Sequence, residues 1–296
     1  MPERVITSTH NPRVKQAAKL RDKRQRSKQG RILIDGAREL LLAVEAGVEV
    51  VEVFVCESHC RTQPCQQALE RLPETGAAVW HVSPEVFEKL AFGARTEGVI
   101  GVALTPERTL ADLKIPPGAL VAVLVGVEKP GNVGAVLRSA DGAGISAVIV
   151  ADAGTDLYNP NCIRASLGTV FTAAVCTADS QTALKWLLER GDRIFAATLD
   201  AERSYTDADY RQGAAIVLGS EAEGLPPEWR GEGITKIKLP MGGAADSLNV
   251  SATAAVLFYE ARRQRGVDVE QVGSSDIHLP LTLPSPARGE GDARAI

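Results

Sequence analysis

The sequence lacks any apolar run long enough to cross a bilayer, and its first residues, MPERVITSTHNPRVK, contain no apolar signal-peptide core. We therefore expect a cytoplasmic protein with no membrane partner. A disulfide framework is also missing, because five cysteines are an odd and small number for 296 residues. This count favours reduced thiols, as expected inside the cell.

Recognisable metal motifs are absent as well. Cys56, Cys60 and Cys65 stand close together with His59 between them. However, the C-x3-C-x4-C spacing differs from the paired ligands of a structural zinc site. We predict that this cluster binds no metal.

Positive charge is scarce overall, since the net charge is −4. It is nevertheless concentrated between Arg13 and Arg31, where Asp22 is the only acid. Such a cluster can bind phosphates by releasing counterions, although a solvated helix face is the alternative. The candidates for RNA contact within it are Arg13, Lys15, Arg24 and Arg26.

Alternating strand and helix patterns predict an α/β protein with two cores. We expect a first domain over 1–104, a proline-containing linker over 105–118, a second domain over 119–265 and a disordered tail over 266–296. In the first domain, the expected helices are 12–29, 37–46 and 84–90, and the expected strands are 48–55 and 99–104 beside an apolar stretch at 31–34.

The second domain begins with a nearly continuous apolar run over 119–127, which is typical of a parallel strand buried on both faces. A helix is expected from Asn132 to about Gly142. The remaining expected strands are 147–150, 172–176, 194–199, 214–218 and 236–239, and the last helix spans about 247–265.

Glycines between the first strand and helix of this domain, in the segment 128–134, let backbone approach a ligand closely. The segment is neither G-x-G-x-x-G nor a Walker loop, which argues against nicotinamide and nucleoside-triphosphate enzymes. Asn132 is predicted to cap the helix. Arg138 stands in an apolar stretch, and because a buried charge is costly, it must bind either an anion or an internal acid.

Two later segments place small and polar residues beside expected strand ends. Gly219 to Leu225 follows the strand 214–218, at the edge where parallel sheets bind ligands. Ser247 and Asn249 open the final helix, where either residue could be its N-cap or could hold a ligand.

Together these segments resemble the SpoU (TrmH-like) RNA 2′-O-ribose methyltransferases of the SPOUT superfamily. The resemblance covers about residues 5–265 and includes an N-terminal substrate-binding part. Its motifs are matched by Asn132, Gly134, Arg138, Ala140 and Gly144, then by Leu218, Gly219, Glu221, Gly224 and Leu225, then by Pro240, Met241, Gly243, Ser247, Leu248, Asn249, Val250, Ser251, Ala254, Tyr259 and Glu260.

The resemblance implies an α/β fold whose C-terminal domain is a deep trefoil knot with a mainly parallel sheet, preceded by a small ribosomal-protein-like α/β domain. It also implies a homodimer that uses S-adenosyl-L-methionine. The implied cofactor residues are Thr198, Leu199, Gly219, Ser220, Glu221, Gly224, Leu239, Met241 and Leu248. The implied catalytic residues are Arg138, which also contacts RNA, Asn132, Glu221, Ser247 and Asn249.

We therefore predict methyl transfer to a ribose 2′-hydroxyl in RNA, with ribosomal RNA as the first choice of substrate and transfer RNA as the second. Arg138 is a poor general base because its pKa exceeds about 12, so we assign it to a phosphate and to the developing alkoxide. Two alternatives remain: a catalytically inactive RNA-binding protein on this fold, and a SPOUT enzyme that methylates a base.

Overall fold

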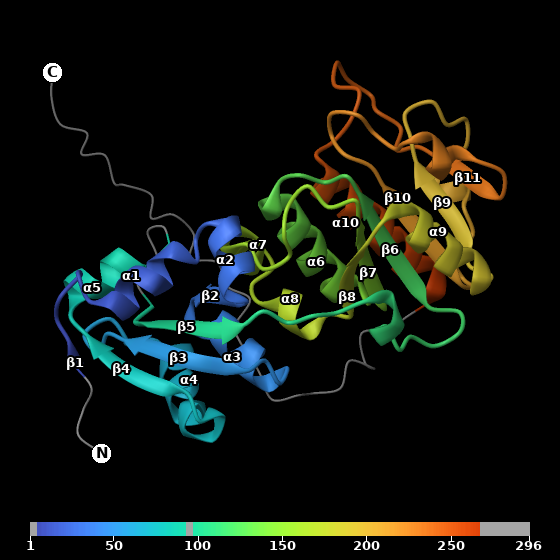
Figure 1. Cartoon of the computed structure of the whole chain (residues 1–296). Coiled ribbons are helices and arrows are strands. Elements are labelled where there is room, and N and C mark those ends of the chain that lie inside the picture. Colours follow the sequence, from blue (N-terminus) through green and yellow to red (C-terminus); the bar gives the residue numbers. More distant parts are fainter. Residues whose placement is uncertain (1–4, 93–96, 267–296) are drawn as a thin grey trace, which may run out of the picture. The chain divides into compact units, whose positions relative to one another are not determined.

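Two β-sheets with helices on both faces make up the part of the chain that the computed structural model describes, residues 5–92 and 97–266 (Figure 1). The predicted α/β class is therefore confirmed. Within these ranges, no helix combines the length and apolar character that a membrane span requires. The disordered tail predicted over 266–296 lies outside the described residues, apart from Gly266.

The first sheet has the strand order β1-β4-β3-β5-β2. Strands β1, β4 and β3 run parallel, whereas β5 is antiparallel to both β3 and β2. The strands are β1 (Val5–Ile6), β2 (Arg31–Asp35), β3 (Val50–Val55), β4 (Ala78–Val82) and β5 (Val99–Leu104).

Helices cover both faces of this sheet. Phe54 and Phe87 belong to a core shared by α1 and α5, whereas Leu40 and Leu72 belong to a core shared by α3 and α4. The helices are α1 (Pro12–Lys19), α2 (Lys23–Gln29), α3 (Ala37–Glu45), α4 (Gln63–Thr75) and α5 (Pro84–Leu90).

The single basic helix expected over 12–29 is wrong, because the chain breaks into α1 and α2. Asp22 starts the second helix, and its carboxylate accepts a hydrogen bond from the backbone N–H of Gln25. An aspartate at this position competes with helix continuation by capping.

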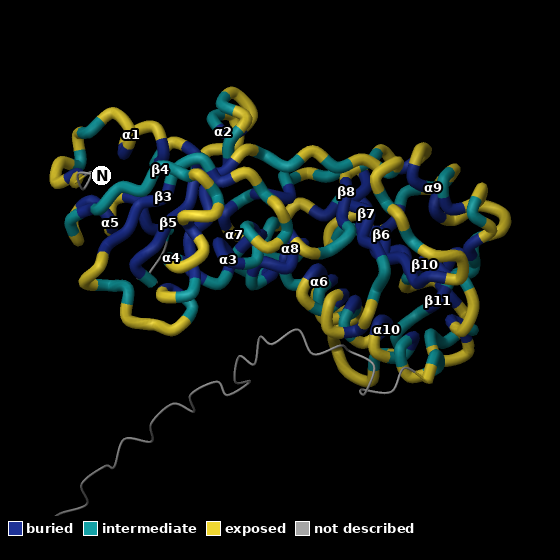
Figure 2. Tube along the Cα trace, turned by 90° about the horizontal axis from the view of Figure 1, so that it is seen from below, coloured by how far each residue is buried: buried dark blue, intermediate teal, exposed yellow. Residues whose placement is uncertain are grey.

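The second sheet is entirely parallel, with the strand order β11-β9-β10-β6-β7-β8. Figure 2 shows its central strands buried along their length, as the apolar run at 119–127 predicts. The strands are β6 (Leu120–Val125), β7 (Ala147–Ala151), β8 (Val175–Ala178), β9 (Arg193–Ala197), β10 (Ala214–Leu218) and β11 (Ile234–Ile237).

One face of the second sheet packs against four helices, α6 (Pro130–Ala143), α7 (Pro160–Ala165), α8 (Thr169–Thr172) and α10 (Val250–Arg265). The other face packs against α9 (Ser180–Glu189) and the short 3-10 helices η1 (Leu110–Asp112) and η3 (Pro227–Arg230). A third 3-10 helix, η2 (Tyr205–Asp207), lies between β9 and β10.

Most of the expected helices and strands are confirmed, and a few are missing or shifted. The sequence pattern did not predict β1, α4, β4, α7, α8 or α9, and it placed β8 too early and β11 too late. Residues 169–172, which have a strand-like composition, form α8 because tertiary packing overrides the β-propensity of Val170 and Phe171.

The prediction of five reduced thiols is wrong for one pair. Cys60 and Cys65 form a disulfide, whereas Cys56, Cys162 and Cys176 are free and buried. Thr62 caps α4 by accepting from the N–H of Cys65, and this turn brings the two paired Cα atoms to 5.5 Å. That separation suits a disulfide, and a count of cysteines cannot reveal it.

Candidate active site and cofactor cavity

The second sheet has a cavity at the carboxyl ends of its strands. Its strand order diverges at β6, with β7 and β8 on one side and β10, β9 and β11 on the other. Parallel sheets bind ligands at this edge, near such a switch point. The cavity beside it measures about 550 Å³, within the usual size of small-molecule sites.

Three loops and the start of α10 form the walls of this cavity. The loops follow β9, β10 and β11, so residues far apart in sequence meet because parallel strands all end at one edge. Every residue that the sequence analysis assigned to the cofactor lines the cavity: Thr198, Leu199, Gly219, Ser220, Glu221, Gly224, Leu239, Met241 and Leu248.

The loop after β10 folds back on itself at Gly219. Ser220 and Gly224 exchange backbone hydrogen bonds of 3.2 and 3.0 Å, and Gly224 adopts a positive φ of 68°. A Cβ atom on Gly219 would lie only 2.7 Å from the backbone nitrogen of Leu225. Only glycine therefore permits this tight loop, which exposes backbone groups to the cavity.

Three of the predicted catalytic residues meet at the rim of the cavity. The Oε1 atom of Glu221 accepts hydrogen bonds from the side-chain amides of Asn132, at 3.0 Å, and Asn249. The Asn249 amide also lies 3.3 Å from the Asn132 carbonyl oxygen. These side chains come from α6, the loop after β10 and the residue before α10, so only the fold brings them together.

Lys129 completes this polar cluster, although no sequence motif identified it as a site residue. Its Nζ atom lies 2.9 Å from Oε2 of Glu221. The hydrogen bond from Lys129 is the main reason that the pKa of Glu221 falls below its ordinary value. A lysine three residues before a predicted site asparagine was the available signal, but many solvent-exposed lysines have the same setting.

Asn249 and Asn132 lie at the starts of α10 and α6, and only Asn249 caps its helix. Asn249 caps α10, because its Oδ1 atom accepts from the N–H of Ser251 at 2.9 Å. The predicted capping role of Asn132 is wrong, since Lys129 occupies the N-cap position and Asn132 lies inside the first turn. The amide of Asn132 is consequently available to Glu221.

The chemistry of the cavity suits a nucleoside-bearing cofactor. Leu239, Met241 and Leu248 provide apolar surface, and the tight Gly219 loop provides backbone donors and acceptors. A flat base with polar edges requires this combination. Within the described ranges no His, Cys, Asp and Glu group is arranged to hold a metal ion.

Comparison with known proteins assigns both halves of the chain. The family model described as the SpoU rRNA Methylase family matches residues 119–259, and the model of the MRM3-like substrate binding domain matches residues 11–101. The 23S rRNA (guanosine-2'-O-)-methyltransferase RlmB of Bordetella pertussis is 34% identical over 223 residues, which cover 73% of this chain and 90% of that protein. The chain belongs to the SpoU rRNA methylase family.

Solved structures of SpoU-family proteins and their relatives share the fold. An RNA 2'-O ribose methyltransferase is 45% identical, with a TM-score of 0.79, covering 88% of this chain and 99% of the other. The AdoMet-bound rRNA methyltransferase from Sinorhizobium meliloti is 26% identical, also with a TM-score of 0.79, covering 88% and 97%. These matches confirm the resemblance found in the sequence.

Arg138 has a different environment from the one expected of this SpoU-family residue. The apolar composition around it predicts burial, but the side chain lies on the exposed side of α6. Val136 and Leu137 beside it face the core instead. Arg138 makes no hydrogen bond or ion pair with any residue in 5–92 or 97–266, so an internal salt bridge does not explain it.

Ser247 lies apart from the three-residue cluster. It lines the cavity, and its hydroxyl donates to Asp246 at 3.2 Å. The structure therefore brings Ser247 close to the cofactor cavity but shows it bonded to neither Glu221 nor Asn249.

The basic segment near the N-terminus contains residues in three different settings. Lys15 and Arg24 are exposed. Arg13 is also exposed but forms an ion pair with Glu52 and covers the ring of Trp80 at 4.4 Å.

Arg26 is buried and is not available to RNA, which corrects its prediction. Its guanidinium donates to the carbonyls of Leu20 and Arg21 and forms a 2.6 Å ion pair with Asp156. The four candidates for RNA contact look alike in sequence, and the turn between α1 and α2 directs this one inward.

Proposed function

We propose that this protein transfers a methyl group to a ribose 2′-hydroxyl of ribosomal RNA. The observation that carries the proposal is the cluster of Asn132, Glu221 and Asn249 at the rim of a nucleoside-sized cavity. A protein that had kept only the fold for RNA binding has no need of this converging set of polar groups. The reaction type is inferred from SpoU-family relatives that are named as rRNA 2′-O-methyltransferases.

S-adenosyl-L-methionine is the proposed cofactor, and when bound it supplies the methyl group. The adenine ring would be held by Leu239, Met241 and Leu248 and by backbone of the Gly219 loop. The proposal is supported by the AdoMet-bound structures of similar proteins. Thr198, Leu199, Ser220, Glu221 and Gly224 complete the proposed contacts.

The residues at the rim orient the reacting hydroxyl. Glu221 holds the amides of Asn132 and Asn249 in place by accepting a hydrogen bond from each of them. Orientation of this kind lowers the barrier by removing translational and rotational freedom before the reaction. Ser247, on the cavity wall, is proposed to help position the ribose.

Arg138 is proposed to bind the phosphate beside the target ribose and to stabilise the developing alkoxide. Its exposure and its lack of a partner among the described residues support this role, since the planar guanidinium is available for bidentate binding. An arginine stays protonated and so cannot accept the proton of the hydroxyl, which passes to an RNA phosphate or to water.

The N-terminal half is proposed to recognise structured RNA. Its match to the substrate binding domain and the exposed Lys15 and Arg24 support this role, and so does Arg13, whose side chain stays half-exposed despite its contacts with Glu52 and Trp80. The division at 1–104, 105–118 and 119–265 remains our proposal. Transfer RNA is the second choice of substrate.

A homodimer, a trefoil knot and a cytoplasmic location are further parts of the proposal. Exposed apolar residues at Val256 and Tyr259 support a partner surface along α10. After β11 the chain turns back, and α10 packs against β10 and along α6. This course of the chain supports the knot. The ribosomal substrate supports the location.

The test is methyl transfer from labelled S-adenosyl-L-methionine to ribosomal RNA, followed by mass spectrometry of the nucleosides. We expect the label on a ribose 2′-oxygen. Label on a base would support the base-methylating alternative, and no transfer by wild-type protein that binds the cofactor would support the inactive one.

A further inference from the structure

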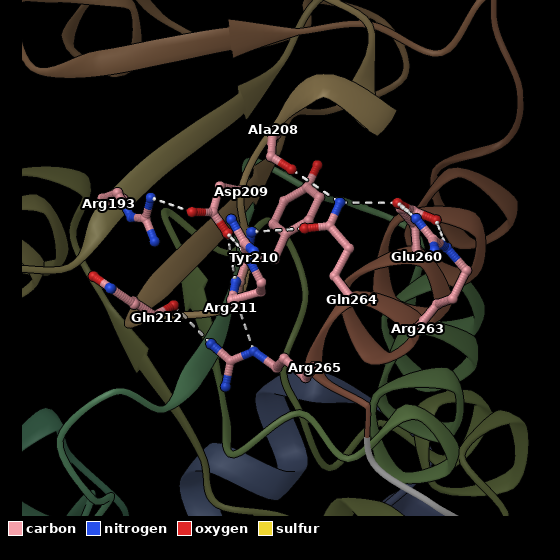
Figure 3. Close-up of polar contacts among 10 residues, drawn as sticks. All are labelled: Arg193, Ala208, Asp209, Tyr210, Arg211, Gln212, Glu260, Arg263, Gln264 and Arg265. Carbon is pink, nitrogen blue, oxygen red and sulfur yellow. Dashed lines mark hydrogen bonds and ion pairs between the residues drawn. The ribbon is translucent and has the colours of Figure 1, made fainter.

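The last two residues of α10 hold a distant turn of the chain, residues 208–212 (Figure 3). Gln264 donates to the Ala208 carbonyl at 2.9 Å and accepts from the Tyr210 N–H at 3.0 Å. Arg265 donates to the carbonyls of Tyr210, at 2.7 Å, Gln212, at 2.8 Å, and Gly118, at 3.0 Å. We call these two side chains the α10 clamp.

The clamped turn ends a segment that begins in the wall of the cofactor cavity. Residues 198–200 follow β9 and line the cavity. Midway, the Tyr205 N–H donates to the carbonyl of Lys238, another cavity residue, at 3.0 Å. The buried Tyr210 then donates from its hydroxyl to the Tyr205 carbonyl, so the clamped turn and the cavity wall are connected by consecutive hydrogen bonds.

Aromatic packing makes this connection stiff. The Tyr210 ring is fully buried and meets the Phe195 ring edge-on at 5.0 Å. Phe195 belongs to β9, the strand that leads directly to residues 198–200. Displacement of Tyr210 would therefore disturb the strand as well as the turn.

The opposite end of α10 reaches the polar cluster of the active site. Asn249 caps this helix and bonds Glu221, while Val250 and Thr253 line the cavity. An α-helix of sixteen residues is about 24 Å long and moves as one body, because its backbone hydrogen bonds resist stretching. The axial position of α10 thus sets the position of Asn249.

We infer that Gln264 and Arg265 are positioning residues for the cofactor site, although neither touches the cavity. They fix the axial position of α10 relative to the segment 198–212, and so align two walls of the same cavity. Loss of either side chain leaves backbone carbonyls unpaired and lets the two walls shift relative to each other. This inference rests on the proposed cofactor.

The test is the affinity of Gln264→Ala and Arg265→Ala for S-adenosyl-L-methionine, measured by calorimetry well below the melting temperature of each variant. We expect a Kd about five- to tenfold higher than that of the wild type. Hydrogen exchange in residues 198–212 should accelerate in parallel. Arg265→Lys keeps the positive charge and a donor for the turn but cannot reach all three carbonyls that Arg265 holds, so it should give a smaller increase.

Two controls separate positioning from simple stabilisation. Arg211→Ala removes only the ion pair of this side chain with Asp209 in the same turn, and should bind the cofactor like the wild type. Ile32→Val weakens the core of the first sheet and should lower the melting temperature with no change in Kd.

The results distinguish three cases. Clamp variants that lower the melting temperature but keep the wild-type Kd would refute the inference. If both alanine variants fail to fold, the Kd of Arg265→Lys decides in the same way. Wild-type protein that binds no S-adenosyl-L-methionine would instead refute the proposed function.

Discussion

Replacing Glu221 with glutamine tests the central cluster of the site with almost no change of shape. The amide oxygen can still accept from Asn132 and Asn249, but the charge is lost, and an N–H donor now faces Lys129. Hydrogen bonds to charged groups contribute about 1.5–3 kcal/mol, and neutral ones about 0.5–1.5 kcal/mol. Each asparagine contact therefore weakens by about 1 kcal/mol.

Two weakened contacts amount to about 2 kcal/mol, or about a thirtyfold loss of rate if they act fully in the transition state. This is an upper figure, because the Glu221 and Lys129 side chains are 31% and 72% exposed and water screens them. Stability should change little, since an exposed ion pair contributes about 0–1 kcal/mol. We expect a melting temperature within about 4 °C of the wild type.

The assay is kcat/KM for methyl transfer from labelled S-adenosyl-L-methionine to ribosomal RNA, with thermal unfolding measured in parallel. Glu228→Gln is the matched control, because it makes the same change at an exposed position outside the cavity. If Glu221→Gln kept its rate within about threefold of the wild type, orientation by this carboxylate would be the wrong explanation. The test is valid at neutral pH, because the lowered pKa of Glu221 keeps this carboxylate charged there. The contribution of the charged carboxylate is lost only as the pH falls below 4.5.

Three further predictions concern single residues. Arg138→Lys should lower kcat by about tenfold or more at unchanged cofactor Kd, because a lysine cannot bind a phosphate bidentately; near-normal turnover would show that bidentate binding is not needed. Gly219→Ala should weaken cofactor binding by about tenfold or more, because its Cβ would meet the backbone of Leu225; an unchanged Kd by calorimetry would contradict this account of the loop. Burial raises the pKa of Asp35 to about 6, so this group destabilises the fold above pH 6, and the penalty disappears as the pH falls towards 3.8. Asp35→Asn should remove a penalty of up to about 3 kcal/mol at pH 8, and equal stability of variant and wild type in urea at that pH would refute the burial argument.

Strands and ligand loops of the second sheet were predictable from local pattern. A continuous apolar run predicts a strand covered on both faces, and β6 has that pattern because helices flank it on each side. Glycine positions also have local causes, since Gly219 and Gly224 permit a turn that other residues would prevent. The cofactor residues were identified through the family resemblance, and they meet in one cavity.

Burial and pairing of charges were not predictable. Arg138 was expected to be buried and is exposed, whereas Arg26 was expected at the surface and is buried. Composition reports the average polarity of a segment, but the direction of one side chain depends on helix phase and on the turn before it. The disulfide of Cys60 and Cys65 depends in the same way on a capped turn.

The sequence by itself determined the α/β class, the parallel strands, the glycine loops and, through its motifs, the family. Only the tertiary structure decided that Glu221 joins Asn132, Asn249 and Lys129, and that α10 is held at its far end by Gln264 and Arg265. The physical reason is distance along the chain. Local patterns act within a few residues, whereas these contacts join segments separated by tens of residues. They meet because parallel strands place all their carboxyl ends at one edge of the sheet, where the site lies, and all their amino ends at the other, where Gln264 and Arg265 bind.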